Sequence, residues 1–185
     1  MNLHPTPIPS AFSAPVAPGT ARVAVAMSGG VDSSVAAALL VEQGYDVVGV
    51  HMKLHDLPDD EKRDKSCCSL DDSLDARQAC AKLGIPFYVL DYVADFRALV
   101  IDYFEQSYLA GRTPNPCVMC NRTVKGTLLL EQVRAFGCEA LATGHYAGLR
   151  HNPTTGDLAM VRPVDRRKDQ TYFLFGTPRG DLGHL

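Results

Sequence analysis

The segment from Ala26 to Ser34, with the sequence AMSGGVDSS, limits the possible folds of this chain more than any other segment. It follows a short apolar run, Arg22 to Met27, that is typical of a buried strand, and it precedes a helical pattern that ends at Gly44. The segment is therefore predicted to be a strand-to-helix turn. Its two adjacent glycines let the backbone approach a ligand, and the amides and positive dipole end of the new helix favour an anion. With the hydroxyls of three serines as further donors, these features predict a phosphate-binding loop for ATP.

This loop differs from two common nucleotide-binding loops. It lacks the Gly-Lys-Ser/Thr ending of a Walker A loop and the third glycine of the dinucleotide fingerprint. The run from Ser28 to Ser34 resembles instead the PP-loop of the N-type ATP pyrophosphatases, which adenylate a substrate oxygen and release pyrophosphate. That resemblance implies that Asp32 helps to hold Mg²⁺ near the leaving pyrophosphate. The alternative is a glycine turn capped by serines.

Length and composition limit the classes of protein that fit. At 185 residues the chain can form one α/β domain plus an appendage. Its net charge of −3 gives no overall basic field, so any RNA contact must depend on local patches. Without an apolar stretch near the roughly 20 residues of a membrane span, we expect a cytoplasmic protein with no membrane association. Its six cysteines are then expected to be mostly reduced.

Strand and helix patterns alternate along most of the chain. This alternation predicts a doubly wound, Rossmann-like parallel sheet covered on both faces, with ligands at the carboxyl ends of the strands. After the first strand, the further strands are expected at 47–52, 86–90 and 140–143. Three further helices are expected. One begins at a cap at Ser69 and ends at Leu83, and another covers 122–136. The third ends near Gly111 and has one apolar face formed by Phe96, Leu99, Val100 and Tyr103.

The pattern divides the chain into three parts. Residues 1–20 hold five prolines among small residues and are expected to be a disordered leader. Residues 21–148 carry the alternating pattern and form the predicted ATP-binding catalytic domain. Residues 149–185 begin a second element, in which the turn signal from Asn152 to Asp157 predicts a hairpin.

A second chemical feature is the segment from Thr113 to Asn121, which we expect to be a proline-braced loop that presents Cys117 and Cys120. Helix-start amides and the helix dipole lower the pKa of a thiol, which favours a nucleophilic or metal-binding thiolate. On its own, the pair is equally consistent with half of a zinc site, a thioredoxin-like couple or two small buried residues.

Taken together, the motifs resemble the tRNA-uridine 2-sulfurtransferases, also called tRNA 2-thiouridylases, over about 22–175. That family uses ATP and Mg²⁺ to replace the C2 oxygen of the tRNA wobble uridine with sulfur, and pyrophosphate and AMP leave. The matching stretches are Ala26 to Ser34, Val50 to Met52, Cys67 to Ser69, Gly111 to Asn121, Ala142 to Tyr146 and Lys168 to Phe173.

The resemblance implies a role for each matching residue. The ATP phosphates would lie against Ala26, Met27, Ser28, Gly29, Gly30, Val31, Asp32 and Ser33, and the nucleoside against Met52 and Gly144. The target base would contact Asn115, Pro116 and Cys117, and Cys120 matches the catalytic cysteine. Further tRNA contacts fall on His145, Lys168, Asp169 and Gln170. Without this context, each residue has an ordinary structural interpretation. Met52 would be a core residue, His145 would be a loop residue with its hydrogen bonds satisfied, and the basic run 166–168 would lie on the solvated surface.

The chain departs from the family pattern in three ways. Cys117 stands where some members carry aspartate, so sulfur is carried either by an iron–sulfur cluster, such as [4Fe-4S], on Cys117 and Cys120 or by a persulfide on Cys120. Gly126 replaces an aromatic residue in a helix, at an expected cost of about 1 kcal/mol relative to alanine. Family members are also considerably longer, and their second catalytic cysteine lies beyond Leu185. Cys67 or Cys68 is the candidate to supply that sulfur in its place.

Three functions follow from these features. The first is the catalytic amino-terminal portion of a tRNA sulfurtransferase, supplied by sulfide or a sulfur-donor protein. The second is another PP-loop adenylating enzyme, which would have no use for the paired cysteines. The third is a catalytically incomplete fragment that binds ATP or tRNA.

Overall fold

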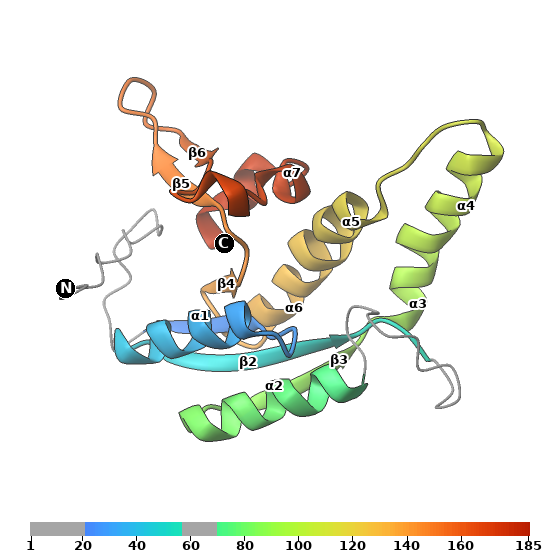
Figure 1. Ribbon diagram of the computed structural model, residues 1–185. Helices are drawn as coiled ribbons and strands as arrows, with labels where there is room; N and C mark the ends of the chain where they lie inside the picture. The colour runs from blue at the N-terminus through green and yellow to red at the C-terminus, as the bar shows by residue number, and fades with distance from the viewer. Residues whose placement is uncertain (1–20, 57–69) are drawn as a thin grey trace.

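The computed structural model describes residues 21–56 and 70–185, and its centre is a four-stranded sheet (Figure 1). The strands pair in the order β3-β2-β1-β4, and all three pairings are parallel. The strands are β1 (Arg22–Ala26), β2 (Asp46–Lys53), β3 (Phe87–Asp91) and β4 (Ala140–Thr143). The predicted parallel sheet is confirmed, and each expected strand is found.

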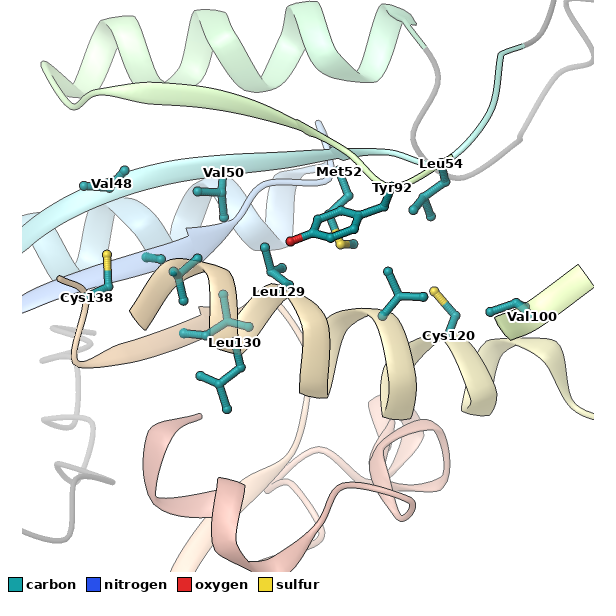
Figure 2. Packing of buried hydrophobic residues seen from close by; sticks show 14 residues of the cluster. Val48, Val50, Met52, Leu54, Tyr92, Val100, Cys120, Leu129, Leu130 and Cys138 are labelled. Atoms are coloured by element: carbon teal, nitrogen blue, oxygen red, sulfur yellow. The ribbon is translucent and has the colours of Figure 1, made fainter. Parts of the chain in front are cut away.

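Helices cover both faces of the sheet. On one face, α1 (Val31–Glu42) and α2 (Leu70–Leu83) pack a cluster that includes Val25, Ala37 and Cys80. On the other face, the helix formed by η3 (Cys120–Leu129) and α6 (Leu130–Ala135) packs against β2 and β1 (Figure 2). Burial on both faces explains why the strands are almost continuously apolar, as parallel strands usually are.

The helix predicted from Phe96 to Gly111 consists of three consecutive segments. These are α3 (Val93–Phe96), the π-helical η2 (Arg97–Ile101) and α4 (Asp102–Leu109), and Gly111 follows with a φ of 71°. In the first helix, α1, the periodic residues Val31 and Val35 are 77% and 49% exposed. The buried positions of α1 are Ser33 and Ala37 instead, because small side chains allow close contact between helix and sheet.

The cysteine segment is helical where the sequence predicted a loop. The helix begins with α5 (Pro116–Met119) and continues directly into η3, so it starts before the predicted Arg122. Asn115 is the N-cap, and its side chain accepts a hydrogen bond of 3.1 Å from the amide of Val118. Pro116 follows at the first helical position, which needs no backbone donor. The prolines therefore start a helix instead of bracing a loop around the cysteines.

The remaining residues form a separate hairpin and short helices. Strands β5 (Gly148–His151) and β6 (Leu158–Val161) pair antiparallel, as the turn signal predicted. The short helices are η4 (Arg166–Lys168), α7 (Thr171–Leu174) and η5 (Arg179–His184). Within the residues described, no helix is long and apolar enough to span a membrane. Ser69, the predicted cap of α2, lies outside the described residues.

Gly126 has a structural role that its helix propensity does not reveal. It is buried in η3, where a Cβ atom would lie 2.8 Å from the backbone oxygen of Asn121, five residues earlier. Thr127 makes the same five-residue connection, because its hydroxyl donates to the Arg122 carbonyl at 3.1 Å. A π-helical turn brings these atoms close together, and glycine leaves room for them.

We therefore predict that Gly126→Ala destabilises the protein, although the same change stabilises an ordinary helix by about 1 kcal/mol. The free energy of unfolding should fall by about 1 kcal/mol or more, because the new methyl group meets a backbone atom. Urea unfolding measures this change. The control is Gln78→Ala, an exposed site in α2, which should stay within about 0.5 kcal/mol of the parent. A more stable Gly126→Ala protein would contradict the prediction.

Candidate functional site

The glycine-rich loop lies at the carboxyl edge of the sheet, directly after β1. Its first residue is fixed by β2: the amide of Met27 donates to the Val50 carbonyl at 2.8 Å, and the carbonyl of Met27 lies 2.8 Å from His51 Nδ1. His51 is 1% exposed and lies one residue before the end of the buried part of β2. No role was predicted for His51 from the sequence, although the residue lies in one of the matching stretches.

The serine hydroxyls of the loop bind the loop itself. The buried Ser33 Oγ accepts from the amide of Ser28 at 3.2 Å and donates to the Gly30 carbonyl at 3.1 Å. Ser34 Oγ also donates to the Gly30 carbonyl, at 3.0 Å. Gly30 is the N-cap of α1 and provides no side-chain cap, so the first amides of the helix are available to an anion.

Two glycines let other backbone segments approach this loop closely. A Cβ atom on Gly29, whose φ is 79°, would lie 2.5 Å from the backbone oxygen of Asp72 in the first turn of α2. A Cβ atom on Gly144, just after β4, would lie 2.6 Å from the amide nitrogen of Ser33. The loop thus lies between α2 and the end of β4. These contacts fix the loop, and the first amides of α1 are donors of the kind that an anionic group such as phosphate requires.

Tyr146 connects the loop to a distant segment. Its hydroxyl donates to Asp32 Oδ1 at 3.0 Å, which raises the pKa of Tyr146. Its backbone amide donates to Gln170 Oε1 at 2.8 Å, and the Gln170 amide donates to the Tyr146 carbonyl at 3.0 Å. Asp32 and Gln170 were predicted from separate motifs, and the structure joins them through this tyrosine. No sequence signal singled out Tyr146 beyond its place beside His145.

His145 is held as a neutral side chain. Its Nδ1 lies 2.9 Å from Thr143 Oγ1 at the end of β4. Burial, with a smaller contribution from the positive charge of Lys125, lowers the pKa of His145 from 6.5 to about 4. At neutral pH this histidine therefore offers a hydrogen bond and no charge to a ligand.

The two cysteines lie in different environments on one helix. Cys117 is exposed in the first turn, whereas Cys120 is 9% exposed and belongs to the core cluster that also contains Val100 (Figure 2). The start of this helix packs against α7. Asn121 Nδ2 donates to the Phe173 carbonyl at 3.2 Å, and Asn115 Nδ2 reaches the Tyr172 hydroxyl at 3.5 Å.

The structure places three other predicted residues apart from any evident ligand position. Met52 is 5% exposed and packs in the core with Leu54 and Tyr92 (Figure 2). Lys168 is exposed in η4. Asp169 accepts from the amide and hydroxyl of Thr171 and from Arg162, and these bonds lower its pKa to about 2. Asp169 therefore holds the start of α7 in place.

The described residues do not form a complete metal site. None of them form a group of three or more His, Cys, Asp or Glu side chains that would hold a metal ion. A cluster of the [4Fe-4S] type uses cysteine thiolates as its ligands, usually four. Cys117 and Cys120 are two, their exposure differs, and Cys67 and Cys68 lie outside the described residues. The cysteines that the structure describes do not fit a cluster.

Comparison with known proteins agrees with the motifs. Residues 21–185 match the family described as the tRNA methyl transferase HUP domain. The chain belongs to this family. It is 54% identical over 165 residues to the tRNA-specific 2-thiouridylase MnmA of Magnetococcus marinus, covering 89% of this chain and 46% of that protein. It is 52% identical over 171 residues to the protein of the same name from Rhizobium etli, covering 91% and 42%.

The chain therefore spans less than half the length of these two curated relatives. Among solved structures, glutamine-dependent NAD⁺ synthetase from Acinetobacter baumannii is 22% identical, with a TM-score of 0.45 and coverage of 65% of this chain and 20% of that one. A predicted tRNA methyltransferase subunit from Methanocaldococcus jannaschii is 19% identical, with a TM-score of 0.45 and coverage of 75% and 58%. These structural likenesses carry no functional argument.

The two loop glycines of this HUP domain should respond differently to substitution. We predict that Gly29→Ala lowers the free energy of unfolding by about 1–3 kcal/mol, because its positive φ and its contact with Asp72 both disfavour a side chain. Gly30→Ala should stay within about 0.5 kcal/mol, since its φ is −80° and the nearest atom to a Cβ would be 3.5 Å away. Urea unfolding of both variants measures the difference, and equal effects would contradict this reading of the loop.

His145 should make stability depend on pH. Its pKa is about 4 in the folded protein and near 6.5 when unfolded, so between these values the unfolded state binds more protons. The free energy of unfolding should therefore fall as pH decreases from 6.5 to 4, and His145→Gln should remove that part of the dependence. Nuclear magnetic resonance titration of the His145 ring measures the folded pKa directly. A midpoint near 6.5 would refute the assignment.

Proposed function

We propose that this chain is the catalytic amino-terminal portion of a tRNA-specific 2-thiouridylase. Such an enzyme activates the C2 oxygen of the tRNA wobble uridine with ATP and then replaces that oxygen with sulfur. The main support is that one chain combines two features. One is a glycine-rich loop held by close backbone contacts at Gly29 and Gly144, and the other is a helix with a Cys-x-x-Cys sequence that packs against α7. Relatives at 54% and 52% identity that bear this name support the proposal.

The ATP site is assigned to the loop and its neighbours. The backbone from Ala26 to Ser33 would hold the phosphates, because the first amides of α1 receive no side-chain cap. Gly144 allows the end of β4 to approach the loop, which gives the nucleoside a wall there. Asp32 would hold Mg²⁺, which supplies positive charge to the leaving pyrophosphate. Met52 would support the nucleoside site from within the core, without touching the nucleotide.

The proposed reaction has two displacements. In the first, the uridine C2 oxygen attacks the α-phosphorus of ATP, the bond to the β-phosphate oxygen breaks, and pyrophosphate leaves. In the second, a sulfur nucleophile attacks C2, the bond between C2 and the adenylated oxygen breaks, and AMP leaves with that oxygen. The adenylate makes the oxygen a good leaving group, so sulfur replaces it without further activation. A sulfur-donor protein would pass persulfide sulfur to Cys120. The terminal sulfur of this persulfide bonds to C2 as AMP leaves. A second thiol then attacks the Cys120 sulfur, which forms a disulfide with Cys120 and releases 2-thiouridine.

Cys120 is assigned as the cysteine that delivers sulfur, with Cys117 beside the target base. Cys117 is the accessible thiol of the two, while Cys120 lies in the core. Because Cys120 is buried in the cluster that contains Val100, sulfur delivery from it requires that bound RNA moves the cysteine helix enough to expose this thiol. No step is assigned to an iron–sulfur cluster, because the described cysteines do not fit one.

The RNA contacts are assigned to both sides of α7. Asn115 and Pro116 would face the target base from the start of the cysteine helix. His145 would offer a neutral hydrogen bond, and Lys168 a positive charge for phosphate. Gln170 would contact tRNA, and Tyr146 connects Gln170 to Asp32 of the nucleotide loop. Asp169 would support the others by fixing α7.

The role of Cys120 can be tested by single-turnover thiolation of unmodified tRNA with ATP, Mg²⁺, a persulfide sulfur donor and a thiol reductant. We predict that Cys120→Ser slows formation of 2-thiouridine by more than about a hundredfold, because it removes the sulfur-delivering thiol. Pyrophosphate release should persist, because the ATP loop is unchanged and this release belongs to the first displacement. Cys138→Ala, which alters a buried cysteine of the core, is the control and should retain thiolation.

Loss of thiolation in Cys117→Ser but not in Cys120→Ser would transfer the catalytic role to the exposed thiol. If the parent chain binds ATP and tRNA but forms no 2-thiouridine, the catalytically incomplete fragment is the correct description.

A further inference from the structure

Helix α7 exposes two aromatic rings to solvent. Tyr172 and Phe175 are 61% and 67% exposed, and their ring centroids lie 5.8 Å apart at an angle of 42°. Tyr172 also contacts Phe173 edge to face, with centroids 5.7 Å apart. An exposed pair of large rings one helical turn apart is typical of a binding surface.

These rings are held beside the exposed thiol of Cys117. The Asn115 amide, immediately before Pro116 and Cys117, reaches the Tyr172 hydroxyl at 3.5 Å. Asn121 binds the backbone of Phe173, and Gly176 lies against the side chain of Arg122. Figure 1 shows α7 next to α5. The rings are therefore set in position by the same residues that begin the cysteine helix.

The residues around the rings are mainly cationic. Arg166, Arg167 and Lys168 come directly before the turn that leads to α7, and Arg122 is exposed on the adjoining helix. Arg167 pairs with Asp165, and Asp169 pairs with Arg162. Arg166, Lys168 and Arg122 form no ion pair with a carboxylate among the described residues. This surface therefore combines aromatic faces with unneutralised positive charge.

We propose that Tyr172 and Phe175 form a stacking platform for an unpaired nucleobase of RNA next to Cys117. Single-stranded RNA is recognised largely by stacking of splayed bases on aromatic side chains, and its phosphates bind nearby cations. A protein segment would also cover exposed rings, but the cationic residues favour a polyanion. This inference rests on the proposed function, because it assumes that the substrate is tRNA.

The test measures binding of an anticodon stem-loop that carries 2-aminopurine in place of the wobble uridine. In the parent protein, stacking should quench the fluorescence of this base. Tyr172→Leu and Phe175→Leu should each weaken binding by about tenfold and reduce the quenching, as expected for loss of one stacking face. The slope of affinity against salt concentration should not change, because no phosphate contact is lost.

Two further variants separate stacking from general effects. Tyr172→Phe keeps the ring and loses only the hydroxyl contact with Asn115, so it should bind within about twofold of the parent. Tyr108→Leu replaces a ring on α4 that is 55% exposed and should leave binding unchanged. A loss of binding in Tyr172→Phe equal to that in Tyr172→Leu would overturn the stacking role.

Thiolation of tRNA by the parent protein is measured in parallel, so that the two proposals can fail separately. If the parent thiolates tRNA while both leucine variants bind RNA normally, the platform is wrong and the proposed function stands. If the leucine variants bind RNA normally but unfold at a lower temperature, the rings stabilise the folded protein and do not stack on RNA. That result also overturns the platform. Quenching without thiolation supports the platform and contradicts sulfur transfer. If the parent does not bind RNA, both proposals fail.

Discussion

The close approach of three backbone segments at the end of β1 is the constraint on which the rest of the site depends. The first turn of α2 and the end of β4 both touch the glycine-rich loop, and only Gly29 and Gly144 leave room for that contact. His51 adds a buried hydrogen bond to the carbonyl of Met27. Because the loop is fixed on three sides, its amides need little reorganisation before they meet an anion.

From this loop, the C-terminal segment is tied back to the sheet by Tyr146. The Tyr146 hydroxyl donates a hydrogen bond to Asp32 in the nucleotide loop. The backbone of Tyr146 makes two hydrogen bonds with Gln170, one to its side chain and one to its amide. Gln170 lies just before α7, which packs against the start of the cysteine helix. The proposed ATP site and the proposed RNA surface are thus connected by a short chain of contacts, although their residues are far apart in the sequence.

The two cysteines of the cysteine helix lie in different environments. Its first turn is exposed at Cys117, and its next turn buries Cys120 in the core under β2. The helix continues with π-helical hydrogen bonding, which brings the Asn121 carbonyl close to Gly126. A side chain at that position would push against the backbone in the middle of the helix that covers one face of the sheet. Gly126 and the π-helical hydrogen bonding of η3 therefore depend on each other.

Local pattern in the sequence was enough to predict the four strands, the hairpin and the glycine-rich loop. Apolar periodicity and glycine stops depend on neighbouring residues, so they can be read along the chain. The start of the cysteine helix was missed because the prolines were interpreted as a brace, whereas Asn115 caps a helix there. Tertiary structure alone decided that Tyr146 joins Asp32 to Gln170 and that Cys120 is buried while Cys117 is exposed. Those facts depend on contacts between segments distant in sequence, and no local pattern encodes them.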